Sequence, residues 1–193
     1  MASYINATSA KNRVKLLIVK KSAIAAFATT GKPVQADFYT ATNNTTGEIT
    51  TKVNKPVELS GLQDVTINNS NGSFRWKQLD LSGESVITTN ATNSLSGNFV
   101  LDTTDFWGTT TATFTTDAGT ATGDGIFKMS NDRTEVAFLI APSGAIDGET
   151  VIMGTGFISA LAPTVSADSP VWVSPITIEV NGDYERALVE AGV

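Results

Sequence analysis

The sequence predicts a mainly β protein: an antiparallel β-sandwich or barrel with one short flanking helix and an extended N-terminal arm and hairpin. Three observations predict this class. Thr-rich stretches alternate polar and apolar residues, which suits a pleated sheet. Short β-type runs are separated by frequent Asn/Gly turn signals, a rhythm typical of sandwiches and barrels. Long stretches with helical periodicity are almost absent.

The chain length suits a single domain, residues 1–193, with a real hydrophobic core. We expect residues 1–60 to form an arm and a projecting hairpin region, and residues 61–193 to form the core. No repeat of solenoid length and no linker between two domains is evident.

The N-terminal third predicts an arm, a strand and a hairpin. Residues 1–12 are polar and indicate an arm, Val14–Val19 is a strand, and Ser22–Ala28 fits either a strand or a helical turn. Ala36–Thr42 and Glu48–Val53 flank an Asn/Thr/Gly turn and predict a long hairpin. Its sides are too polar for core strands. It is therefore either a surface loop or an arm that becomes ordered only against a neighbour.

The middle of the chain predicts several short strands. Four β-type runs are separated by the turn signals NNSNG, SGE and NATNSLSG, and these runs are Leu62–Ile67, Ser73–Leu81, Glu84–Thr89 and Asn98–Leu101. Phe74 and Trp76 share one strand face, whereas Leu79 and Leu81 fall on the other. This change of face predicts a bulge near Lys77 or Gln78.

Residues 102–109 are the best internal helix candidate. Asp102 is suited to cap the helix, and Asp105 lies in its first turn, where acidic residues are favoured. Three further strands are then predicted, Thr111–Thr116, Gly125–Met129 and Glu135–Ile140, with residues 130–133 closing the last two as a hairpin. The uninterrupted apolar run VAFLI predicts a central strand.

The stretch Thr150–Arg186 predicts two strands joined by a loop. In the first, bulky Val151 and Met153 share a face with Phe157 and Leu161, while small residues lie on the other face. Other elements could therefore pack on both faces of this strand. In the second, Trp172, Ile176, Ile178 and Val180 line one side. Asn181-Gly182 is a tight-turn signal. Residues 183–193 fit either a return strand or a short helix, and the helix is favoured.

Charge divides unevenly along the chain. Residues 1–60 carry a net charge of +5 and residues 61–193 carry −11, which gives −6 in all. One interpretation is a protein with uneven surface charge. The other is complementarity between identical copies, with the basic segment of one meeting the acidic body of the next. The acidic body disfavours tight binding of nucleic-acid phosphates.

The chain contains no Cys and no His. Thiolate nucleophiles, most zinc sites and the usual Ser-His-Asp triad are therefore excluded. Gly154-Thr155-Gly156 follows a strand, but a third Gly is missing and Pro163 prevents the following helix, so a dinucleotide site is not predicted. We expect no catalytic residues, no cofactor, no metal and no membrane span.

The C-terminal third resembles bacteriophage tail tube (major tail) proteins. The resemblance lies in a Gly-rich strand, a loop with Asp168, a second alternating strand and a closing turn; the matched positions are Gly154, Gly156, Phe157, Ser159, Asn181 and Gly182. These positions are expected to determine the fold. The resemblance implies a structural virion protein of the tail, made in the host cytoplasm. It also implies hexameric rings, stacked into a conduit through which DNA is ejected.

The partners implied are further copies of the chain, other tail proteins, and DNA that passes without specific binding. We expect contacts between rings from residues 1–12 and from the segment 31–61. The candidate contact residues are Lys11, Arg13, Lys15, Thr40, Asn44, Lys52 and Lys55.

Two alternatives remain open at this point. A Thr-rich β-sandwich is also typical of binding modules of the adhesin or carbohydrate-binding kind, and exposed aromatic residues on one sheet face would favour that function. Another virion protein, such as a head-decoration protein, would share the solution chemistry of a tail tube protein and differ mainly in forming trimers on a shell.

Overall fold

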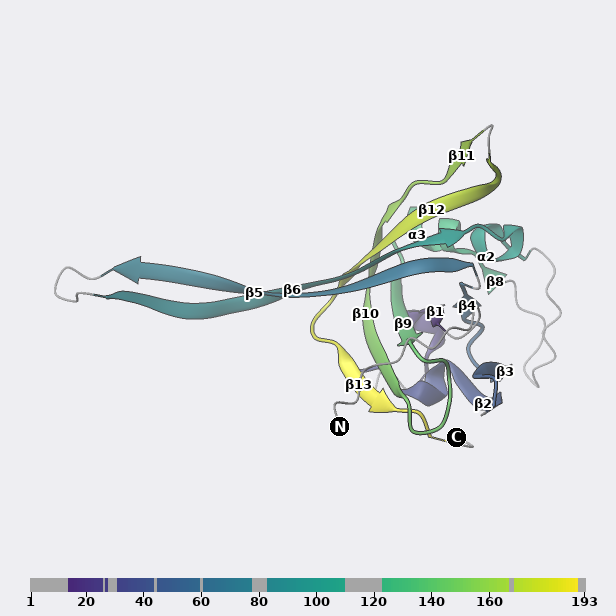
Figure 1. Ribbon diagram of the computed structural model, residues 1–193, viewed down its shortest axis with the longest axis horizontal. Coiled ribbons are helices and arrows are strands. Elements are labelled where there is room, and N and C mark those ends of the chain that lie inside the picture. Colours follow the sequence, from purple (N-terminus) through teal and green to yellow (C-terminus); the bar gives the residue numbers. More distant parts are fainter. Residues whose placement is uncertain are drawn as a thin grey trace.

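The computed structural model describes residues 14–25, 27, 31–43, 45–59, 61–77, 83–109, 123–166 and 169–190. Most of its strands form one antiparallel sheet, and a long ribbon extends from the body to one side (Figure 1). The strands of this sheet are β1 (Lys15–Lys20), β4 (Val57–Glu58), β5 (Leu62–Lys77), β6 (Glu84–Val100), β9 (Glu135–Ala141), β10 (Thr150–Leu161), β11 (Thr164–Ser166), β12 (Ser169–Val180) and β13 (Glu185–Leu188).

The sheet is curled so that its two ends lie close together. Its order is β4-β1-β9-β10-β12-β6-β5, with β11 beside β12 and β13 beside β10. The end strands β4 and β5 are consecutive in the chain and are joined by residues 59–61. Leu59 N–H donates to the Leu16 carbonyl, and Val100 N–H donates to the Gly61 carbonyl. The predicted antiparallel sandwich or barrel class is therefore confirmed, in a barrel-like form.

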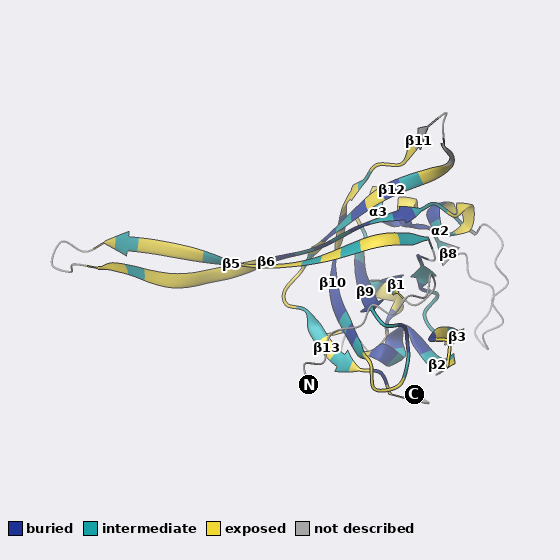
Figure 2. Cartoon of the chain, viewed as in Figure 1, coloured by how far each residue is buried: buried dark blue, intermediate teal, exposed yellow. Residues whose placement is uncertain are grey.

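The central strands β1, β9 and β10 are buried on both faces. Alternate residues such as Leu16, Phe138 and Ile158 point into the curled sheet and form an inner cluster with Ile178. The residues between them form an outer cluster on the opposite face, and its members include Leu17, Leu139, Val151, Met153, Phe38, Tyr39 and Val189. Figure 2 shows these strands as the most buried part of the chain. The prediction that VAFLI is central is confirmed.

The predicted N-terminal hairpin is present as β2 (Tyr39–Asn43) and β3 (Glu48–Lys52), which pair antiparallel. It lies against the body instead of projecting from it. Phe38 and Tyr39 at its base are fully buried in the outer cluster, and the partly buried Ile49 of β3 packs against the same cluster. The other residues of the two strands are polar except Ala41. Short 3₁₀ turns at Lys21–Ala23 and Gln35–Asp37 precede it. The expected arm, residues 1–12, lies outside the described residues.

The element that projects is the ribbon of β5 and β6. The prediction of four short strands was wrong, because NNSNG lies inside β5 and NATNSLSG lies inside β6. The register shifts occur between Leu62 and Asp64 and between Asn71 and Ser73, whereas Lys77 pairs regularly with Glu84. Asn and Gly mark turns only where the chain reverses. Residues 68–71 and 88–92 are exposed on both faces of the ribbon, so no core selects for apolar residues there. Asn93, Leu95 and Gly97 are buried where the ribbon meets the body.

In the described part of the chain, two short helices, α2 and α3, lie beside the sheet. Helix α2 (Thr103–Trp107) confirms the predicted helix, and the Asp102 carboxylate accepts hydrogen bonds from the N–H groups of Thr104 and Asp105 at 2.8 and 3.4 Å. Helix α3 (Ile126–Asn131) contradicts the predicted strand at 125–129 and the hairpin closed by 130–133. Its buried Ile126 and Met129 are three residues apart, one helical turn, and close the inner cluster.

The small strands β7 (Gly108–Thr109) and β8 (Gly123–Asp124) pair with each other. The strand predicted at 111–116 lies outside the described residues.

The two predicted C-terminal strands are present as β10 and β12, but the favoured terminal helix was wrong. Residues 185–188 form the return strand β13, which pairs with Thr150–Met153 of β10. β12 occupies the same edge of β10 further along, from Gly156 to Leu161. Without β13, this part of β10 would leave its backbone groups unpaired on that edge.

Candidate assembly surfaces

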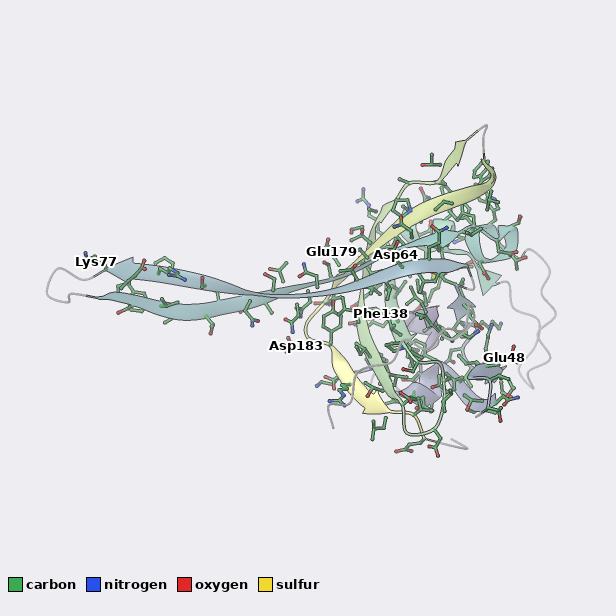
Figure 3. The ribbon with its side chains drawn as sticks, viewed as in Figure 1. Glu48, Asp64, Lys77, Phe138, Glu179 and Asp183 are labelled. Atoms are coloured by element: carbon green, nitrogen blue, oxygen red, sulfur yellow. The ribbon has the colours of Figure 1, made fainter. Side chains whose placement is uncertain are left out.

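The projecting ribbon has three zones. Near the body, Leu95 and Phe99 are buried in the inner cluster. The middle, around Asn68 and Thr92, is polar and exposed. The outer zone, residues 73–77 and 84–88, is here called the hairpin head; Lys77, labelled in Figure 3, lies near its end.

The hairpin head presents an apolar face to solvent. Phe74 pairs with Ile87 and Trp76 with Ser85, and residues opposite each other in an antiparallel pair point to the same face. The rings of Phe74 and Trp76 stack with centroids 6.0 Å apart. Phe74 is 56% exposed and Ile87 is 51% exposed. Val86 and the pair formed by Arg75 and Glu84 lie on the opposite face.

A second apolar surface lies at the start of α2. A cavity of about 340 Å³, here called the α2 pocket, lies between α2 and β12; its lining includes Leu101, Asp102, Thr103, Trp107, Val171 and Trp172. Trp107 and Trp172 are about half exposed. The Trp107 ring also contacts Phe106 and Phe127, with centroids 4.7 and 5.0 Å away. This places a supported aromatic cluster at the protein surface.

Two carboxylates make the α2 pocket region acidic. Asp102 lines the pocket, and Asp105 lies in the first turn of α2. Burial, reinforced by the negative charge of Asp102, raises the pKa of Asp105 to about 6, although nearby Lys52 opposes the shift. A cation placed near these two carboxyl groups would reduce the repulsion between them.

The candidate contact residues Lys15 and Lys52 are both bound to Glu58 within the chain. Their ammonium groups lie 2.6 and 2.8 Å from the two Glu58 carboxylate oxygens. Burial acts to raise the pKa of Glu58, but the hydrogen bonds and charges of the two lysines outweigh it and hold this pKa below its usual value. The Lys15 side chain is only 12% exposed, and its ion pair with Glu58 is formed within the subunit.

Other lysines of the basic N-terminal segment also pair within the chain. Lys20 pairs with Asp124, Lys21 with Glu135 at 2.8 Å, and Lys32 with Glu185. All three acids belong to the acidic part of the sequence. Much of the charge complementarity seen in the sequence is thus used inside one subunit, which weakens the hypothesis that it joins neighbouring copies.

The remaining candidate contact residues are scattered. Thr40 lies half-buried in β2, and Lys55 follows β3 with a positive φ of 56°. Lys11, Arg13 and Asn44 lie outside the described residues. The structure does not bring the described candidates together into one exposed patch.

The glycines of the Gly-rich strand allow close packing. A Cβ atom at Gly154 would lie 2.7 Å from the Phe138 ring, and one at Gly156 would lie 2.1 Å from the carbonyl oxygen of Glu179 (Phe138 and Glu179 are labelled in Figure 3). These contacts give both glycines a role in the packing of the fold.

The other positions of the matched pattern surround these glycines. Phe157 is partly exposed, and the Ser159 hydroxyl donates to the Thr177 carbonyl at 3.4 Å. Asn181 N–H donates to the Thr155 carbonyl at 2.7 Å, and Gly182 has a φ of +94°. After Asn181-Gly182 the chain continues into β13, which pairs with β10. The predicted tight turn therefore does not close a hairpin between β12 and β13.

No metal site or membrane helix is found in the described ranges. They contain no group of three or more acidic side chains placed to hold a metal ion. No helix there has both the length and the apolar character needed to cross a bilayer.

Comparison with solved structures identifies the fold. The chain aligns with the SPP1 tail tube, a hybrid solid-state NMR and cryo-EM structure, with a TM-score of 0.51, 11% identity, and coverage of 95% of this chain and 81% of that one. The chain has a tail tube protein fold. The resemblance seen in the sequence is confirmed at this level.

Two further structures are similar at lower TM-scores. The tail of an empty gene transfer agent particle, with C6 symmetry, has a TM-score of 0.48, 13% identity, and coverage of 80% of this chain and 98% of that one. The six-fold symmetrised baseplate of an anti-feeding prophage gives 0.46, 8% identity, and coverage of 98% and 99%. No protein-family profile and no curated protein sequence matches the chain.

Sequence reasoning missed both surfaces of this tail tube fold. For the hairpin head, the shared face of Phe74 and Trp76 was visible, but the predicted turns assigned it to the core. For the α2 pocket, the signal was the apolar pair Phe106-Trp107 on a helix too short to bury both residues. Trp172 comes close to this aromatic pair because β12 pairs with β6, and that pairing is between segments far apart in the sequence.

Proposed function

We propose that this chain is a structural subunit of a phage tail tube, located in the virion tail after synthesis in the host cytoplasm. It assembles into hexameric rings that stack into a conduit for DNA ejection. The observation that carries the proposal is the tail tube fold, aligned over nearly the whole chain with the SPP1 tail tube. The role is architectural, and the partners are further copies and other tail proteins.

The free edge of β5 supports self-assembly. β5 pairs with β6 along one side, and its other edge has no partner strand among the described residues. A long unpaired edge offers a row of backbone N–H and C=O groups to another chain. Soluble proteins normally protect such edges, so an edge of 16 residues suits a subunit that is covered in an assembly.

The acidic charge is consistent with a conduit. With a net charge of −6, the subunit as a whole repels phosphate groups. A passage for DNA benefits from weak contacts, because bound DNA would not slide. We therefore expect no retention of duplex DNA by the free protein at physiological salt.

Negative-stain electron microscopy combined with sedimentation velocity tests the proposal. At rising protein concentration, we expect rings, or tubes with a central channel, and a matching growth of fast-sedimenting species. Class averages of end-on views give the ring symmetry. Particles that stay monomeric at every concentration would count against the proposal.

One observation favours a second candidate, a carbohydrate-binding module. Trp107 and Trp172 both line the α2 pocket and are about half exposed, as aromatic residues that stack on sugars are. Titration with oligosaccharides while Trp fluorescence is recorded separates the candidates. Saturable quenching that is lost in Trp172→Ala would support this alternative, and a flat titration would remove it.

A further inference from the structure

The hairpin head has an apolar face that its own subunit does not cover. Among the described residues, β6 is the strand that pairs with the head portion of β5. Isolated two-stranded ribbons are marginally stable in water, and exposed aromatic residues add an unfavourable contact with solvent. Stacked Phe74 and Trp76 beside Ile87 thus form a ready docking face.

The α2 pocket is the opposite kind of feature, a cavity whose walls combine apolar and aromatic side chains with the polar Asp102 and Thr103. Its size, about 340 Å³, is in the range that receives large side chains. The Trp107 ring is held by contacts with the rings of Phe106 and Phe127. The backbone of Trp172 is fixed by the hydrogen bond from Leu101 N–H to its carbonyl. Such preorganised aromatic residues are typical of the centres of interfaces.

The two surfaces lie at opposite ends of the molecule. The head is at the far end of the ribbon, and α2 and β12 are on the other side of the body (Figure 1). One chain therefore cannot place its own head in its own pocket. The head carries a net charge of +1 from Arg75, Lys77 and Glu84, whereas Asp102 lines the pocket. The head charges lie on the face opposite Phe74, so they favour the approach of the two surfaces and do not form part of the docked contact.

We infer that the hairpin head of one copy docks in the α2 pocket of the next copy, with the apolar face of Phe74, Trp76 and Ile87 against Trp107 and Trp172. The contact is heterologous, so each docked copy still offers a free head and a free pocket, and the same contact repeats along the assembly. The inference rests on the proposed function and names the surfaces that join its subunits.

Site-specific crosslinking tests the pairing. The chain has no Cys, so each variant carries a single thiol. Ser85→Cys places the thiol on the apolar face of the head, and Thr103→Cys places it at the α2 pocket. The two variants are mixed with an excess of wild-type chain, assembled, and treated with a short bis-maleimide. Thr88→Cys, on the opposite face of the same strand, replaces Ser85→Cys in the control.

We expect crosslinked peptides that join residues 85 and 103, and their loss when Thr88→Cys is used. Assemblies without the 85–103 product, or with equal yield from position 88, would overturn the docking and leave the proposed function standing. A dominant 85–85 product would also overturn it, since it indicates head-to-head contact. A wild-type chain that never assembles would overturn both the docking and the proposed function.

Substitution of one tryptophan of the α2 pocket gives an independent readout. If Trp107 and Trp172 are central to the interface, Trp172→Ala should raise the protein concentration needed for assembly by about tenfold or more. Leu188→Ala is the matched control, because Leu188 is 56% exposed on β13, away from both surfaces. An equal effect of the two substitutions would contradict the docking.

Discussion

Gly156 of β10 faces the carbonyl oxygen of Glu179 on β12, and the two strands approach so closely that a Cβ atom at Gly156 would lie 2.1 Å from that oxygen. The obstacle is backbone in the middle of the sheet, which does not move aside as a side chain does. This contact makes the Gly-rich strand a requirement of the fold.

Gly156→Ala should therefore destabilise the subunit by about 3 kcal/mol, the upper part of the usual range for overpacking. Urea denaturation of the monomer, followed by Trp fluorescence, measures the free energy of unfolding. Gly83→Ala is the matched control, because nothing lies within 4 Å of a Cβ atom at Gly83. If the two substitutions had equal effects, the close approach of β10 and β12 would be wrong.

Glu58 should contribute to the stability of the single subunit. Its carboxylate is bound by both Lys15 and Lys52, so Glu58→Gln leaves two ammonium groups without their partner and should cost about 1–3 kcal/mol at pH 7. Because the pKa of Glu58 is held below its usual value, this contribution is present above the ordinary glutamate pKa and is lost as the pH falls through the lowered value.

Double-mutant cycles resolve the two lysines. Lys15 is 12% exposed and Lys52 is 40% exposed, so the coupling of Lys15→Met with Glu58→Gln should exceed that of Lys52→Met with Glu58→Gln. If the lysines instead serve contacts between copies, their replacement would leave monomer stability unchanged and alter assembly alone.

Asp105 should give the subunit an unusual pH dependence. Burial and the charge of Asp102 raise the pKa of Asp105 to about 6 in the folded chain, whereas the unfolded carboxyl titrates near 4. Between these values the folded chain holds the proton more tightly. The contribution of Asp105 to the free energy of unfolding should therefore fall by about 1–3 kcal/mol as the pH rises from about 4 to about 6.

Asp105→Asn should remove this fall and stabilise the protein at pH 7. Urea denaturation of the variant and the wild type at several pH values gives the difference due to this one group. Asp132→Asn is the control, since the hydrogen bond from Lys128 lowers the pKa of Asp132 and shifts it the opposite way. Parallel stability curves for wild type and Asp105→Asn would contradict the prediction.

The sequence predicted those elements whose burial follows a simple period. β9 is an unbroken apolar run because both of its faces are covered, and β10 alternates bulky and small residues because Phe138 and β12 approach its small face. The cap of α2 was also predictable, since Asp102 forms hydrogen bonds with N–H groups only two and three residues away. Local physical chemistry determines all three features.

The elements that were missed depend on distant partners. β13 is a strand because the edge of β10 is open beside it, and its own four residues do not distinguish a strand from a helix. The polar middle of the ribbon has the composition of a turn, because solvent contacts both faces. Charge counts left open whether the uneven charge is a surface property or attracts neighbouring copies, and they cannot reveal that Lys21 lies beside Glu135 of the same chain.

Substitutions at the two ends of the ribbon should have different effects: those at its base should lower monomer stability, and those in the hairpin head should impair assembly. Leu95 is fully buried at its base, so Leu95→Ala should cost about 2–5 kcal/mol of monomer stability. Phe74 is exposed in the head, so Phe74→Ser should change monomer stability by less than about 0.5 kcal/mol while it impairs assembly. Thermal unfolding and sedimentation of both variants provide the two readouts. Loss of monomer stability in Phe74→Ser would show that the head is held by its own subunit.

Hydrogen exchange should reveal the same division without any substitution. In the monomer, amides of residues 95–100 should exchange only through global unfolding, because this end of β6 lies between β5 and β12 and carries buried Leu95 and Phe99. Amides of residues 84–88 should exchange far faster, since a two-stranded ribbon opens locally. On assembly, protection should rise at residues 84–88 and at residues 103–107 of α2, and peptide mass spectrometry resolves both segments. Protection of the head that is already maximal in the monomer, or that does not rise in tubes, would mean that the head contributes nothing to the contact between subunits.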